Sequence, residues 1–199
     1  MNVLDFTPHP KSLKLARQLL AEAGQNEPEI TNDVEEIASV LGAKVVSLEN
    51  KFKTKESLAR KLTDYSITRN ISLEKVATRI NDALRYTLLF SLENYLQDYD
   101  SALKLLVEKG YEVQRIWNAW SNEGKPKDAG YRGINGTIIS SKNQKFEIQF
   151  HTEESFRLKT KTHGLYEERR NPNISKERDE GILQIMQELA TKVERPKGI

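Results

Sequence analysis

The sequence predicts an α+β fold, with one mixed β-sheet flanked by helices in a single domain of 199 residues. Four segments have the composition of strands, namely 85–90, 111–117, 136–140 and 145–151. The last two flank the turn residues 142–144 and therefore predict a hairpin. The order of helical and strand segments is mixed rather than strictly alternating, which favours α+β over a doubly wound sheet.

The composition restricts the class of protein. Hydrophobic residues make up 37% and charged residues 30% of the chain, which is typical of a soluble globular protein. The net charge of +2 gives no argument for bulk nucleic-acid binding, so we expect no DNA partner. Since the chain has no cysteine, disulfides and thiolate metal sites are excluded, and the three histidines are too scattered for a zinc site.

No part of the sequence indicates a membrane protein. No apolar run approaches the roughly 18 residues that a membrane span needs. The N-terminus has neither the basic start nor the apolar centre of a signal peptide. We therefore expect a cytoplasmic site of action and no membrane partner.

Two helices are expected at the N-terminus. Apolar stripes predict helices over 10–23 and 28–41, the first ended by Gly24 and the second begun by Pro28. They carry no chemistry that we can name, and both plain packing and a mobile cap over a site are open interpretations. We divide the single domain, 1–199, into a helical cap, a core and a C-terminal helix, over residues 1–45, 46–170 and 171–199.

The next predicted helix is basic. Thr54 is a suitable N-cap within 51–62, KFKTKESLARKL. Ser57 and Lys61 are four residues apart and share a helix face, which Lys53 reaches from just before the cap. By spacing alone, a solvated basic helix is a sufficient interpretation.

Four further helices follow from caps and apolar periodicity. They are expected over 73–82, after Ser72; over 92–109, after Ser91; over 153–169; and over 176–193, after Ser175.

Two tryptophans lie at the end of the second predicted strand. Trp117 and Trp120 are interpreted as core or rim aromatic residues and not as residues that stack on a ligand.

The stretch 125–152 contains the pattern that most favours a binding site. Two glycines flank Tyr131 and Arg132, which places an aromatic ring and a cation on backbone that a ligand can approach closely. In the strand that follows, the polar side chains share one face because they alternate with apolar ones: Glu147, Gln149 and His151. A phosphorylated ligand with a ring fits this set, and a solvent-facing strand row is the alternative.

Four segments resemble the synthetase domain of the RelA/SpoT family. PKDAGYRGIN and FEIQFHT resemble the family's PK-x-x-GY loop and E-x-Q strand, FKTKESLARKL its K-x-x-x-S segment, and THGLYEERR its closing H-x-x-Y helix. The four occur in order over about 51–170. The resemblance implies a sheet of nucleotidyltransferase type and an ATP-dependent pyrophosphokinase with Mg²⁺ as cofactor. Such enzymes move the β,γ-pyrophosphate of ATP to a ribose 3′-hydroxyl and release AMP.

The resemblance also implies roles position by position. The catalytic residues would be Glu147, Asp82 and Gln149, with Asp82 and Glu147 as the metal ligands. The residues that hold ATP and its phosphates would be Lys53, Ser57, Lys61, Arg85, Lys127 and His163. The residues that bind the acceptor would be Tyr131, which stacks on its base, Arg132, Asn135, His151 and Tyr166.

General chemistry supports these roles independently. Phosphoryl transfer depends on positioning and charge neutralisation more than on covalent chemistry. Carboxylates such as Asp82 and Glu147 hold Mg²⁺ through one or two oxygens while phosphates fill other positions. Lysines offset the charge that builds up in the transition state.

The chain departs from the family pattern at several positions. Asp82 and Arg85 are three residues apart, where the family places five between its aspartate and arginine, and the segment between Lys61 and Asp82 is longer. His151 stands where the family has arginine, and Asn135 where it has histidine.

The segments DALRYT, YRGIN, FEIQFHT and THGLYEERR are more similar to the single-domain, toxin-like branch. That branch implies growth inhibition, an adenine nucleotide or the 3′ end of tRNA as acceptor, delivery within a larger protein, and an immunity or antitoxin partner. Three alternatives stay open: a small alarmone synthetase acting on GDP or GTP, an NAD-using transferase, and a non-catalytic nucleotide or RNA binder.

Overall fold

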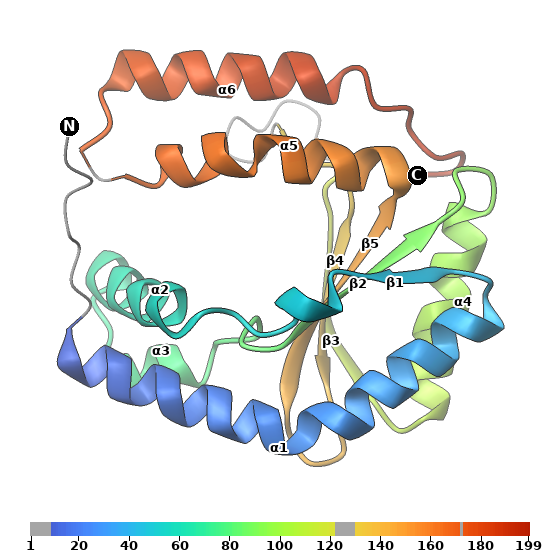
Figure 1. Ribbon diagram of the computed structural model, residues 1–199, viewed down its shortest axis with the longest axis horizontal. Coiled ribbons are helices and arrows are strands. Elements are labelled where there is room, and N and C mark those ends of the chain that lie inside the picture. The colour runs from blue at the N-terminus through green and yellow to red at the C-terminus, as the bar shows by residue number, and fades with distance from the viewer. Residues whose placement is uncertain (1–8, 122–129, 172) are drawn as a thin grey trace.

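The computed structural model describes residues 9–121, 130–171 and 173–199. Its centre is a five-stranded sheet in the order β1-β2-β5-β4-β3 (Figure 1). The strands β2 and β5 are parallel, and the other neighbouring pairs are antiparallel. The predicted α+β class with a mixed sheet is therefore confirmed. The strands are β1 (Lys44–Val46), β2 (Arg85–Phe90), β3 (Glu112–Asn118), β4 (Ile134–Ile139) and β5 (Lys145–Thr152).

Helices surround the sheet on several sides. In Figure 1, α6 lies above α5, α1 runs along the opposite side of the molecule, and α2 and α3 lie beside α1. No helix among the described residues is both long enough and apolar enough to cross a membrane. The helices are α1 (Pro10–Val40), α2 (Lys55–Arg69), α3 (Leu73–Ala77), α4 (Tyr95–Glu108), α5 (Glu153–Arg169) and α6 (Lys176–Ala190), with a 3₁₀ turn at Leu48–Asn50.

The two faces of the sheet differ in chemistry. On β5, Phe146, Ile148 and Phe150 are fully buried in the apolar core, as the alternation predicted. Tyr86 and Leu88 on β2 lie on the same side, in register with β5. The other face of these strands carries polar side chains. The sheet therefore has one apolar face in the core and one polar face that can form a binding site.

The prediction of two N-terminal helices is wrong, because α1 is one helix of 31 residues with Gly24 and Pro28 inside it. Its buried positions continue past the predicted break at seven-residue spacing, at Ala16, Ala23, Ile30 and Ile37. Burial along one stripe outweighs the roughly 3 kcal/mol cost of an internal proline. The helix bends near its middle, as proline causes (Figure 1).

Other boundaries were predicted with mixed success. The caps Thr54, Ser72 and Ser175 are confirmed, since each side chain accepts a hydrogen bond from a backbone N–H of its helix. The prediction for Ser91 is wrong, because α4 begins after Asn94, and Ser91 Oγ instead accepts from the Asn94 N–H. The helix predicted over 73–82 ends at Ala77, which leaves Asp82 in the connection before β2. The short strand β1 was not predicted.

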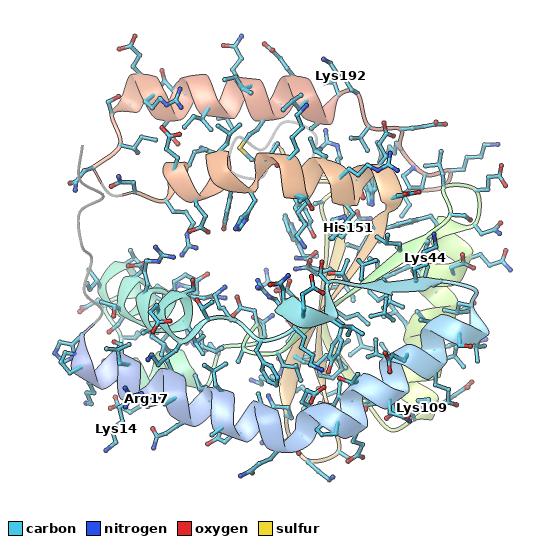
Figure 2. All side chains as sticks on the ribbon, viewed as in Figure 1. Lys14, Arg17, Lys44, Lys109, His151 and Lys192 are labelled. Atoms are coloured by element: carbon cyan, nitrogen blue, oxygen red, sulfur yellow. The ribbon has the colours of Figure 1, made fainter. Side chains whose placement is uncertain are left out.

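Charged side chains tie α4 to α1. Lys109, at the end of α4, lies 2.9 Å from Asp33 and 2.8 Å from Glu36 of α1 (Figure 2). The hydroxyl of Tyr111 donates to Asp33 at 2.6 Å. These contacts fasten the long helix beneath the core face, away from the polar face.

Candidate active site

Two lysines converge on Asp82. Lys53 Nζ lies 2.9 Å from Oδ2, and Lys61 Nζ lies 2.8 Å from Oδ1. The backbone explains this meeting: the Lys53 N–H donates to the Ala83 carbonyl at 3.0 Å, which fixes Lys53 beside Asp82. Thr54 then begins α2, and Lys61 lies on the face of that helix that the spacing predicted.

Asp82 is an ionised carboxylate inside this cluster. Burial on its own would raise the pKa of Asp82, but the charges of Lys61 and Lys53 outweigh it and lower that pKa to about 2. Among the described residues, no group makes a hydrogen bond of regular geometry to Oδ1, although Lys61 is close to it. Lys61 therefore occupies one lone pair of this oxygen as an ion pair, and the second lone pair is available to a further cation.

The register of the sheet arranges the polar face in two rows. Each row runs across the four strands β3, β4, β5 and β2, because paired residues stand side by side. The first row is Arg115, Thr137, Glu147 and Arg85, and the second is Trp117, Asn135, Gln149 and Thr87.

Two side-chain amides hold the Glu147 carboxylate. Gln149 Nε2 donates a short hydrogen bond to Glu147 Oε1, and Asn135 Nδ2 donates to the same oxygen at 3.4 Å. Burial and the nearby charge of Asp82 raise the pKa of Glu147, although Gln149, Lys61 and Arg85 oppose the change. A carboxylate with a raised pKa is suited to take a proton at neutral pH.

Lys159 of α5 belongs to this site, and sequence reasoning missed it. Its ammonium donates a short hydrogen bond to Gln149 Oε1, which also accepts from Thr87 Oγ1 at 3.4 Å. Burial, and then the charge of Arg85, lower the pKa of Lys159 to about 8, while Glu147 opposes this. The sequence carries no local signal for this role, because the helix stripe around Lys159 is recognised as buried only in the structure: Ser155, Leu158 and Thr162.

Tyr131 is fixed at its hydroxyl and on one face of its ring. The hydroxyl donates to Asn135 Oδ1 at 2.5 Å and lies 2.9 Å from His151 Nε2. The ring stacks on Trp117, with centroids 5.4 Å apart and planes at 17°. Tyr131 thus links Trp117, on which it stacks, to Asn135, whose amide holds Glu147.

His151 supports Tyr131 from inside the molecule. It is fully buried between α5 and the sheet (Figure 2), and its Nδ1 lies 2.9 Å from Ser155 Oγ. Burial and then the charge of Lys159 lower the pKa of His151 to about 3, so its ring is neutral. A Cβ at Gly133 would lie 2.8 Å from the His151 ring, which explains the glycine there.

The remaining predicted site residues lie outside this network or on its margin. The Arg132 Nη1 donates to the Tyr131 carbonyl at 3.0 Å, and Ser57 Oγ accepts from Arg60 at 3.4 Å. Arg85 is the register partner of Glu147. On α5, His163 is exposed and Tyr166 is 48% exposed. Lys127 lies outside the described residues. The ligand-binding roles of these residues stay predictions.

A cavity of about 250 Å³ opens beside Glu147. It is lined by Tyr65, Asn81, Arg115, Trp117, Asn135, Gly136, Thr137 and Glu147. A larger cavity of about 430 Å³ lies at the opposite, carboxyl ends of β2 and β5 and contains one residue of the α5 cap, Thr152, but none of the predicted site residues. Because only the smaller of these two cavities is lined by predicted site residues, we take it as the candidate binding cavity.

The residues present fit a magnesium ion. Among the described residues, no three acidic or histidine side chains gather as a complete metal cage. Asp82 and Glu147 would supply two oxygen ligands, and substrate phosphates and water would supply the others, which is the usual way proteins bind Mg²⁺. The Oδ1 atom of Asp82, buried without a regular hydrogen bond, is consistent with such a ligand.

No protein-family model and no curated protein matches the chain. Several solved structures do match it. The type VI effector Tas1, solved in complex with its immunity protein, has a TM-score of 0.58 and 18% identity, over 93% of this chain and 97% of that one. The small alarmone synthetase 1 from Bacillus subtilis, bound to its product pppGpp, has a TM-score of 0.61 and 12% identity, over 88% and 91%.

A GTP pyrophosphokinase family protein from Streptococcus pneumoniae has a TM-score of 0.52 and 12% identity, over 92% of this chain and 91% of that one. At these identities the likeness concerns the fold. The chain has the fold of the RelA/SpoT-type synthetases, as its sequence predicted.

Proposed function

We propose that this protein transfers the β,γ-pyrophosphate of ATP, as one unit, to the 3′-hydroxyl of a nucleotide. The observation that carries the proposal is the placement of Glu147 next to the Lys53–Asp82–Lys61 cluster. Glu147 lies near enough for the charges of Asp82 and Lys61 to change its pKa. A proton acceptor beside a cationic, metal-competent cluster is what this transfer needs.

Each site residue has a separate role in the proposed reaction. Glu147 takes the proton of the 3′-hydroxyl while that oxygen attacks the β-phosphorus of ATP. The bond between the α,β-bridging oxygen and the β-phosphorus breaks, and AMP leaves with the electron pair. Lys53 and Lys61, which pair with Asp82 in the structure, would offset the charge that develops on the phosphate oxygens. Mg²⁺ held by Asp82 would neutralise and orient the phosphates and leave Glu147 to act as the base.

The acceptor that we propose is an adenine nucleotide or the 3′ end of tRNA, and the consequence is growth arrest. Two observations favour this choice. The motifs are more similar to those of the toxin-like branch, and the fold matches an effector, Tas1, over nearly the whole of both chains. Because Tas1 has an immunity protein, we propose a neutralising partner for this chain, and delivery into a target cell as part of a larger protein.

A guanine nucleotide is the second candidate acceptor. The likeness to a small alarmone synthetase bound to pppGpp favours it, with a TM-score of 0.61. In that case the protein makes guanosine alarmones from GDP or GTP. The two candidates share donor, metal and Glu147, and they differ in the acceptor that the cavity takes.

The test is an incubation of the protein with γ-labelled ATP, Mg²⁺ and one acceptor at a time. The acceptors are AMP, ADP, ATP, GMP, GDP, GTP and total tRNA. We expect label on an adenine nucleotide or on tRNA, lost in Glu147→Gln and kept in Glu112→Gln, a matched change at an exposed position of β3. Induced expression should stop growth for the unaltered protein and Glu112→Gln, but not for Glu147→Gln.

Other results would redirect the proposal. Label on guanine nucleotides alone would make the protein a small alarmone synthetase. No transfer to any acceptor would contradict the proposed reaction and favour a transferase with another donor, such as NAD, or a nucleotide-binding role without catalysis.

A further inference from the structure

Two aromatic rings form a stacked pair at the end of the polar face. Trp117 on β3 and Tyr131 are nearly parallel, at 17°, with centroids 5.4 Å apart. That spacing is typical of rings in direct contact, so no base fits between them. A ligand base can therefore stack only on an outer face of the pair.

The two rings differ in what surrounds them. Tyr131 is held at its hydroxyl by Asn135 and His151, and the His151 ring meets it edge-on at 5.3 Å. Of the two rings, Trp117 is the one that lines the 250 Å³ cavity. Trp117 is therefore an aromatic wall of the cavity on the β3 side, with Tyr65 of α2 as the other aromatic lining residue, and Tyr131 supports Trp117 from behind.

The strand order places Trp117 on the acceptor side of Glu147. The Lys53–Asp82–Lys61 cluster lies next to β2, on one side of β5, and Trp117 lies on β3, on the other side. Two strand spacings and one step of two residues separate the Cα atoms of Trp117 and Glu147 by about 12 Å. A nucleoside whose 3′-hydroxyl meets Glu147 can reach Trp117 with its base.

The size of the cavity agrees with a nucleoside. At about 250 Å³ it is just below the roughly 300 Å³ at which pockets for drug-sized ligands begin. Arg115, which is exposed on β3, lines it beside Trp117. The cavity thus has room for a base and ribose, while 5′-phosphates would extend towards solvent.

We infer that the acceptor of this protein is a purine nucleotide whose base stacks on Trp117, with Tyr131 as the support of that ring and not as the stacking partner. The inference rests on the proposed function and gives Trp117 a role that the resemblance does not, since the resemblance places the base on Tyr131. Purines are favoured because their larger ring system covers more of the indole.

Tryptophan emission offers a direct test, since the chain has only two tryptophans. Trp120 is buried, with 1% exposed, and donates to Tyr95 through Nε1, so it serves as the silent reference. The donor site is first saturated with α,β-methylene-ATP and Mg²⁺, which cannot react because the bond that would break is replaced. ADP and GDP are then titrated separately, with Kd measured by calorimetry.

We expect the bound nucleotide to quench the emission of the unaltered protein and of Trp120→Phe, but not of Trp117→Phe. Trp117→Phe keeps a flat ring and should bind the acceptor within a few-fold of the unaltered protein. Trp117→Leu removes the ring and should raise the acceptor Kd about tenfold or more, as base stacking on aromatic side chains contributes on that scale. Its affinity for α,β-methylene-ATP should not change, which also shows that it is folded.

Three results would overturn the inference. If Trp117→Leu binds ADP and GDP as tightly as the unaltered protein, while label transfer is intact, the inference alone fails. If quenching persists in Trp117→Phe, the base lies elsewhere, and the inference fails in the same way. If the unaltered protein binds neither ADP nor GDP and transfers no label, the proposed function fails as well.

Discussion

Glu147 is the residue on which the proposed chemistry depends most. Its Oε1 is engaged by two amides, from Gln149 and Asn135, and its pKa is raised by burial and by Asp82. A base must be ionised to accept a proton, so activity should fall with decreasing pH through a value above the 4.5 of an ordinary glutamate.

Glu147→Gln should therefore lower kcat by about 10²–10³ and remove the acid limb of the remaining activity. The measurement is kcat against pH for the unaltered protein, Glu147→Gln and the control Glu112→Gln. A Glu147→Gln variant with unchanged kcat would show that another group takes the proton.

Lys159 is expected to position Gln149 and, through it, Glu147. Lys159→Met removes the donor to Gln149 Oε1 and a positive charge close to Glu147. We expect kcat to fall about tenfold, KM for ATP to stay within twofold, and the acid limb to move to higher pH, because a lost cation raises a carboxylate pKa further.

Lys159→Arg keeps the charge and should restore most of the activity and the position of the acid limb. A purely structural role would predict loss of kcat without any movement of that limb. Equal pH profiles for Lys159→Met and the unaltered protein would therefore contradict the positioning role.

At the scale of elements, α1 shows how packing overrides local signals. Gly24 lies in the helix interior, has no positive φ, and a Cβ there would meet nothing within 4 Å. Gly42, just after the helix, has φ +63°. Both glycines are exposed, so the change in stability on substitution by alanine reports the backbone conformation rather than side-chain packing.

Gly24→Ala should raise the free energy of unfolding by about 0.5–1 kcal/mol, because alanine loses less entropy in a helix. Gly42→Ala should lower it by about 1 kcal/mol, because a side chain is strained at that φ. Urea unfolding of both variants measures these two changes in the free energy of unfolding, which should have opposite signs. A loss of stability in Gly24→Ala would mean that α1 is not continuous through that position.

The elements around the site were predicted well where one local rule decided them. The alternation of β5 and the caps Thr54 and Ser175 rest on period and on single side chains, and the structure confirms all three. The continuity of α1 could not be predicted from local signals, since Gly24 and Pro28 indicate a break and only the stripe packed against the rest of the molecule outweighs them.

The site itself was predictable only in part. Lys53, Lys61 and Asp82 were expected together, and they meet. Lys159 was missed because its partner Gln149 lies on another element, so no spacing along the sequence reveals the contact. Trp117 was interpreted as a core or rim residue, because its exposure to a cavity depends on how β3, β4 and α2 come together, which the sequence does not show.

At the scale of the whole molecule, the proposed reaction requires a metal. Removal of divalent ions with EDTA should abolish label transfer, and Mg²⁺ should restore it, because two carboxylates and the triphosphate otherwise repel one another. The thermal unfolding temperature should change by no more than a degree or two, since Lys53 and Lys61 already pair with Asp82 without metal. Full activity in EDTA would contradict the metal-dependent mechanism and favour a different donor.

The central claim is that pyrophosphate moves as one unit from ATP to a 3′-hydroxyl. The most direct measurement follows the ³¹P spectrum of the protein with ATP, Mg²⁺ and an adenine or guanine nucleotide acceptor. We predict one AMP for each acceptor consumed, with a new diphosphate coupled to the 3′-carbon of the ribose, and neither product with Glu147→Gln. Formation of ADP with a singly phosphorylated acceptor, or of AMP with free pyrophosphate alone, would contradict the account.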